Sequence, residues 1–168
     1  MFYPTRFALA GACAFAVFSG AAQASEADFL KRFHGSFSGG GQVRMEAAGQ
    51  PHQISCKVSG SSTATSVNIG GTCNAGMMSK NISASLRAGA NGSYTGTYNG
   101  VAGSASLSGR RRGNTIILAV RGAEPATMTI SNGGSGISLS VVANKTQMTH
   151  VSLTRRGRGG PQLASIAQ

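Results

Sequence analysis

The chain has 168 residues, a length that suits one domain, and its 15 lysines and arginines face only four acids, for a net charge of +11. So few carboxylates supply little material for general acid–base pairs or metal clusters, and the composition argues against an enzyme. The same charge favours anionic partners such as acidic lipids, lipopolysaccharide or acidic glycans.

The first 24 residues have the three parts of a secretory signal peptide. Arg6 provides the basic start, residues 7–18 form an apolar run, and small residues ending at Ala24 complete the segment. The run is shorter than the ~20 residues that a membrane-spanning helix needs. We therefore expect cleavage after Ala24 rather than an anchor, no transmembrane segment afterwards, and a periplasmic or secreted bacterial protein of net charge +10, because Arg6 is the only charged residue removed.

After the leader, only residues 25–33 are predicted to be helical. Ser25 can cap the first turn, and Glu26 and Asp28 favour a helix N-terminus. An apolar stripe follows on one face, formed by Phe29, Leu30 and Phe33. We expect this helix to close one end of the domain that follows.

From residue 34 to residue 156, apolar and polar residues alternate in one short segment after another. A period of two is typical of half-buried antiparallel strands. The segments are 54–58, 67–73, 81–88, 101–108, 114–121, 126–131, 137–141 and 148–153. Their cadence predicts an all-β fold, a single antiparallel meander β-barrel of about eight to ten strands, with a two-sheet β-sandwich as the alternative.

Turn signals separate these segments. The strongest are Asn91-Gly92 and Asn99-Gly100, because both residues of the pair tolerate positive φ. Gly60-Ser61-Ser62 is also interpreted as a turn, and Gly39-Gly40-Gly41 as a bulge or kink in the first strand. Residues 157–168 are expected to form a disordered tail.

Two cysteines, Cys56 and Cys73, remain after the leader is removed. An even number in an oxidising compartment predicts a disulfide, and two free thiols are the alternative. Each cysteine is in phase with apolar neighbours, so both are expected to point inward. Their spacing and the absence of a nearby histidine pattern make a poor zinc site, and we predict no metal and no cofactor.

Eight residues in phase with the predicted interior could line a ligand pocket if the barrel is hollow, or fill its core if it is packed. They are Phe37, Ile54, Val67, Leu86, Tyr94, Tyr98, Leu107 and Leu118. A hollow barrel would suit a small apolar ligand.

Two arginine clusters follow predicted strands. They consist of Arg110, Arg111 and Arg112, and of Arg155, Arg156 and Arg158. One interpretation is a rim that binds anions through guanidinium groups, and the other is a solvated loop and tail that prevent edge-to-edge strand pairing. Nucleic acid is not expected as a partner, because the nearby tyrosines are predicted to face inward and the chain is predicted to be exported.

No catalytic group is predicted. The histidines, His34, His52 and His150, lie in three different segments, and Glu46 and Glu124 are the only acids in the body of the domain.

The order of several short motifs resembles a family of small exported alphaproteobacterial proteins of unknown function. The motifs span residues 35–44, 55–58, 71–73, 82–86, 96–98 and 151–156. The family often has Trp where Phe37 and Tyr98 stand here. The resemblance implies export and a β-rich fold, and no activity. A fainter likeness to lipocalin- and avidin-type barrels, through a Gly-x-aromatic first strand and the meander, implies no ligand residues.

Together these features predict an exported, non-enzymatic cell-envelope protein that binds a small ligand or an anionic envelope component. The alternatives are a secreted protein that interacts with a surface or host through its arginine clusters, and a hydrolase.

Overall fold

The computed structural model of the chain describes residues 20–100 and 103–157, and the side chains from residue 25 onward. Most of the expected leader, residues 1–19, and the expected tail from residue 158 lie outside the described residues. The elements are α1 (Gly20–Lys31), β1 (Gly35–Val43), β2 (His52–Ser62), β3 (Ser66–Ala75), β4 (Met78–Ala88), the 3₁₀ turn η1 (Ala90–Gly92), β5 (Ser93–Gly100), β6 (Gly103–Arg112), β7 (Thr115–Arg121), β8 (Ala126–Asn132), β9 (Gly136–Ala143) and β10 (Thr146–Arg155).

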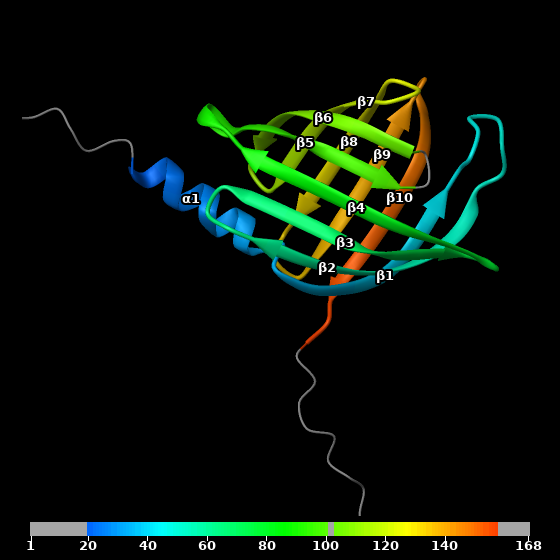
Figure 1. Ribbon diagram of the computed structural model, residues 1–168, viewed down its shortest axis with the longest axis horizontal. Coiled ribbons are helices and arrows are strands. Elements are labelled where there is room, and N and C mark those ends of the chain that lie inside the picture. Colours follow the sequence, from blue (N-terminus) through cyan, green and yellow to red (C-terminus); the bar gives the residue numbers. More distant parts are fainter. Residues whose placement is uncertain (1–19, 101–102, 158–168) are drawn as a thin grey trace, which may run out of the picture.

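The strands form one antiparallel meander that closes on itself, because β1 pairs with both β2 and β10 (Figure 1). In the closing pair, Phe37 lies opposite Arg155 and Val43 opposite Thr149. The predicted barrel is confirmed, and the two-sheet sandwich is excluded because no pair of edge strands remains between β1 and β10.

Inward-facing glycines allow this sheet to curve into a barrel. A methyl group added at Gly41, Gly96 or Gly109 would lie only 1.9 Å from a carbonyl oxygen of the neighbouring strand. Only glycine lets two backbones approach this closely, and such positions kink strands at the corners of a barrel. The expected irregularity at Gly39-Gly40-Gly41 is a kink rather than a bulge, since β1 keeps an unbroken register with both neighbours.

The barrel has two different ends (Figure 1). The plugged end, as we call it, carries α1, the turns that follow β2, β4, β6 and β8, and the end of β10. The far end carries the turns that follow β1, β3, β5, β7 and β9.

Helix α1 begins earlier and ends earlier than the predicted segment 25–33. Residues 20–24 are Gly-Ala-Ala-Gln-Ala, and alanine is the best helix former, so the helix continues back through Ser25. Ser25 is thus not an N-cap in the chain as it stands, contrary to expectation. Phe33 lies in the turn after the helix, where its backbone N–H donates to the Leu30 carbonyl at 3.0 Å.

Two turn predictions had different outcomes. Asn91 and Gly92 both adopt positive φ, 56° and 67°, as predicted. The turn predicted at Gly60-Ser61-Ser62 is wrong, because β2 runs through to Ser62. Gly60 serves a close contact instead, since a methyl group there would lie 2.0 Å from the Phe33 carbonyl oxygen at the plugged end.

The predicted disulfide is present between Cys56 and Cys73. These residues face each other across β2 and β3, and both are buried among the apolar side chains of the interior. Their inward direction agrees with the alternation of apolar residues in both strands.

Candidate functional site

The plugged end is built around the apolar stripe of α1. Phe29, Leu30 and Phe33 are almost completely buried against the barrel interior, and the Phe29 and Phe33 rings meet edge to face with centroids 5.4 Å apart. Burying side chains of this size stabilises a fold by about 1.5–3 kcal/mol each. The helix therefore closes this end of the barrel, as the sequence predicted.

Arg111 holds the second half of the helix through Glu26 and Phe29. The period of two in β6 turns Arg111 inward between Arg110 and Arg112, and its guanidinium forms an ion pair with Glu26 at 2.9 Å. The same guanidinium lies over the Phe29 ring, 4.9 Å from its centroid. The Glu26 carboxylate also accepts a hydrogen bond from the Tyr94 hydroxyl.

Tyr94 is buried beneath this ion pair at the start of β5. Burial raises the pKa of its hydroxyl well above the ordinary value, and the hydrogen bond to the Glu26 carboxylate and the charge of that group raise the pKa further. The phenol therefore stays neutral and acts as a donor that positions Glu26.

Arg155 fixes the last part of the helix from β10. Its guanidinium lies 4.8 Å from the centroid of the Phe37 ring and donates hydrogen bonds to the backbone carbonyls of Arg32 and His34. These carbonyls follow the end of α1, where helix geometry leaves acceptors unpaired. A cation at a helix C-terminus is also favoured by the helix dipole.

The two arginine clusters thus meet at the same end of the molecule, on opposite walls. Arg111, which is half-buried, and Arg155, which is exposed, hold the helix, and Arg110, Arg112 and Arg156 are also exposed. The remaining cluster residue, Arg158, lies outside the described residues. Both clusters thus surround the helix at one end of the barrel, but only some of their arginines contact it.

Asn132 is a structural residue that the sequence analysis did not single out. It is completely buried at the end of β8, and its amide donates to the Arg32 carbonyl at 3.0 Å while its oxygen accepts the Gly134 N–H at 2.9 Å. Its position in phase with Met128 and Ile130 was the available signal, because a polar residue at an inward position needs a specific partner.

The eight residues predicted to face the interior all lie inside the barrel. Phe37, Val67, Leu86, Tyr94, Leu107 and Leu118 are fully buried, whereas Ile54 and Tyr98 are only partly buried. The partly buried pair belongs to the half of the barrel nearest the far end.

Other inward apolar side chains near the far end are also incompletely covered. Ile82, Val120 and Val141 pack against the core but remain partly exposed. Three exposed methionines stand beyond them: Met45 on the turn after β1, Met77 on the turn after β3 and Met78 at the start of β4, with Met77 completely exposed. No helix of the described residues covers this end (Figure 1).

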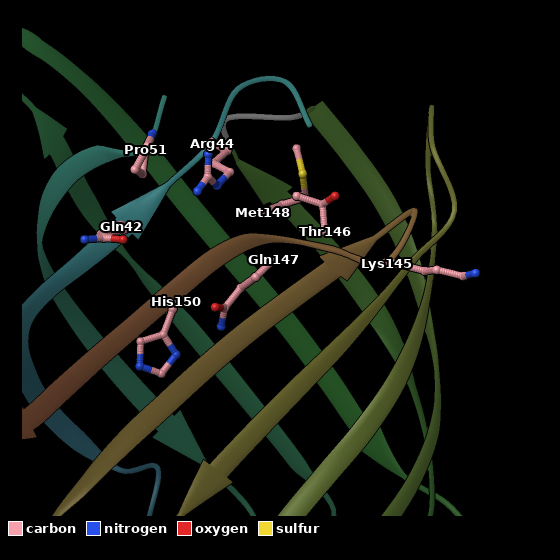
Figure 2. A pocket seen from close by; sticks show the side chains of 8 residues that line it. All are labelled: Gln42, Arg44, Pro51, Lys145, Thr146, Gln147, Met148 and His150. Atoms are coloured by element: carbon pink, nitrogen blue, oxygen red, sulfur yellow. The ribbon is translucent and has the colours of Figure 1, made fainter. Parts of the chain in front are cut away.

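A shallow depression of about 330 Å³ lies on the outer wall between β1 and β10. Figure 2 shows its lining, with Gln42 and His150 on adjacent strands and the Lys145 side chain directed away from both. Its residues are Gln42, Arg44, Pro51, Lys145, Thr146, Gln147, Met148 and His150. With no carboxylate or thiol beside the imidazole, this wall supplies no acid–base pair.

The remaining histidines are dispersed. His34 follows α1 at the plugged end, and His52 begins β2 at the far end. In the ranges 20–100 and 103–157, no three histidines, cysteines or acids lie close enough to hold a metal ion. None of the described helices is long and apolar enough to cross a membrane.

No known protein family and no functionally curated protein matches this chain. Among solved structures, the crystal structure of Rv2717c from M. tuberculosis is similar, with a TM-score of 0.55 and 15% identity over 77% of this chain and 96% of that chain. A de novo designed fluorescence-activating β-barrel has a TM-score of 0.47 and 10% identity over 77% of this chain and 98% of that chain. At these identities the likeness concerns the fold alone.

Proposed function

We propose that this chain is an exported, non-enzymatic binding protein of the bacterial cell envelope that takes a small apolar ligand through the far end of its barrel. The observation that carries the proposal is the contrast between the two ends. One end is closed by buried aromatic side chains and bonded arginines, and the other presents inward apolar side chains that are only partly buried.

Physical chemistry favours an apolar ligand at that end. Inward side chains such as Ile54, Ile82 and Val141 are partly exposed. A ligand that covers them would stabilise the complex by roughly 25 cal/mol per Å² of apolar surface removed from water. Methionines such as Met45 and Met77 are flexible and polarizable, which suits contacts with ligands of varied shape.

Export is supported by the leader-like sequence and by the disulfide. A bridge between Cys56 and Cys73 forms and persists in an oxidising compartment such as the periplasm. The family resemblance of the sequence supports the same compartment. These observations concern location, and the ligand proposal rests on the barrel itself.

Native mass spectrometry of protein purified from its host envelope is the first experiment. Retention of a small molecule would support the proposal and identify the ligand. The intact mass would also report cleavage after Ala24 and the disulfide.

A matched pair of tryptophan variants tests the route into the barrel. Ile82→Trp fills an inward position near the far end, whereas Ile117→Trp adds the same group at an exposed, outward position on β7. With the fluorescent probe N-phenyl-1-naphthylamine, we expect Ile82→Trp to weaken binding at least about tenfold, since a filled site loses its apolar contacts. Ile117→Trp should bind like the parent, and equal binding by both variants would contradict the proposal.

Binding of an anionic envelope component is the second candidate. It is favoured by the placement of both arginine clusters at one end, with Arg110, Arg112 and Arg156 exposed. Salt separates the two candidates, because screening weakens contacts between exposed charges and leaves apolar binding almost unchanged.

A further inference from the structure

We infer that the plugged end of the barrel docks on an anionic lipid bilayer, which leaves the far end facing away from the lipid. The inference rests on the second candidate function, an anionic envelope component, which it narrows to a lipid bilayer, and it does not depend on binding of an apolar ligand. It rests on the placement of cations and acids in the described residues and on the points where the chain enters and leaves the barrel.

One group of cations lies on the outer wall of β4 and β6. Arg87, Arg110 and Arg112 are exposed, and Arg87 and Arg110 lie two strands apart, each pairing with a β5 residue. None of the three forms an ion pair in the part of the chain that the structure describes.

A second group lies on the opposite wall, beside β1. Arg156 follows β10 and donates through Nε to the Ser38 hydroxyl at 3.0 Å, and Lys57 of β2 is the strand partner of Ser38. Both cations are exposed. Arg156 lies at the plugged end, and Lys57 lies midway along β2, so this group extends along the wall from the plugged end, on the other side of the barrel from β6.

The acids do not compensate this charge. The chain has four, and Glu26 and Asp28 already pair with Arg111 and Lys31 at 2.9 and 3.1 Å. The other two, Glu46 and Glu124, belong to turns at the far end. The exposed cations of the plugged end consequently create an uncompensated positive field.

The arrangement of the two groups selects a flat partner. In the closed strand order, β6 lies four strands from both β2 and β10, on the other side of the barrel, and β4 lies between β6 and β2. A linear polyanion lying along one wall would not reach both the β6 arginines and Arg156. A bilayer facing the plugged end would reach both, and each basic residue near such a surface adds to the attraction.

The path of the chain points to the same partner. The apolar residues 7–18, the expected leader, precede α1 in the sequence, and α1 packs on the plugged end. β10 ends there too, and Arg158 follows it in the sequence. The plugged end is therefore the end of the barrel that is nearest in the sequence to the segment expected to contact lipid.

Vesicle sedimentation with matched charge variants tests the inference. The processed protein from its host is mixed with phosphatidylcholine vesicles, with or without phosphatidylglycerol. Arg87→Gln/Arg110→Gln/Arg112→Gln should lower binding to anionic vesicles roughly a hundredfold. Lys80→Gln/Arg121→Gln/Lys145→Gln removes the same charge at or near the far end and should lower binding to anionic vesicles much less. Equal losses, or no preference for anionic vesicles, would overturn the inference.

Tryptophan fluorescence reports the orientation directly, because the chain has no tryptophan. The indole of Ala64→Trp, in the turn after β2, should be quenched by spin-labelled lipid, and that of Met77→Trp, beyond β3, should not. Stronger quenching of Met77→Trp would show the reverse orientation and overturn the inference.

Binding to a soluble polyanion such as polyphosphate, without vesicle binding, would overturn the inference in favour of a polymer. The N-phenyl-1-naphthylamine assay contains no vesicles, so a failure of apolar ligand binding is distinguishable from a failure of bilayer docking.

Discussion

Neighbouring glycines in β3 have different structural roles that the sequence alone does not distinguish. Gly71 faces inward, and a methyl group there would lie 2.2 Å from the Lys57 carbonyl oxygen. At Gly70, which faces outward, the nearest atom would be 3.9 Å away, an ordinary contact. Neither residue has a positive φ, so the difference comes from strand curvature and not from backbone conformation.

These two positions form a matched test of barrel curvature. Gly71→Ala should lower the free energy of unfolding by about 1–3 kcal/mol, because the backbone must move to admit the methyl group. Gly70→Ala should be neutral or stabilising by up to about 1 kcal/mol, since alanine restricts the unfolded chain. Urea denaturation of both variants gives the comparison, and equal effects would contradict the argument.

At the scale of elements, alternation of residues predicted most strands, and it failed where a residue served another element. Gly60 resembles a turn residue but accommodates the Phe33 carbonyl after α1. Gly76, in the β3–β4 turn, has a positive φ of 58° and lacks the Asn-Gly signature that marks the β4–β5 turn, whereas the predicted turn at Asn99-Gly100 is wrong because both residues belong to β5. The inward direction of Arg111 was available from its phase with Leu107, but its partner Glu26 could not be foreseen from strand patterns.

Docking of α1 depends on the neutral form of Tyr94. Its pKa is raised in the folded protein, so its contribution to stability is complete below the unfolded pKa of about 10 and is lost as pH rises above that value. Tyr94→Phe removes this titration. We expect urea unfolding to show a smaller loss of stability above about pH 10 for the variant than for the parent. The same loss in both proteins would mean that Tyr94 does not couple α1 to pH.

The whole molecule combines a closed, locally connected fold with a large positive charge. Barrel class, disulfide and the helix at one end follow from alternation, cysteine number and a single amphipathic segment. The contrast between the two ends cannot be predicted from these features, because it depends on which turns come together when the barrel closes. Phe29 and Arg111 come together only because β6 ends where α1 lies, and no short-range pattern records that meeting.

The charge of the whole molecule should make salt a stabiliser. Only two ion pairs occur among the described residues, and the exposed pair of Lys31 with Asp28 contributes about 0–1 kcal/mol. Repulsion among the many remaining cations is spread over the barrel, and it acts against the compact state. Chloride salt at about 0.3 M shortens the screening distance to less than 10 Å, which weakens repulsion between distant cations more than the contact between Glu26 and Arg111. The thermal midpoint should therefore rise with salt, and should rise less in Lys80→Gln/Arg121→Gln/Lys145→Gln, which begins with three fewer charges. A midpoint that falls with salt would mean that the Glu26–Arg111 pair outweighs the repulsion of the entire surface.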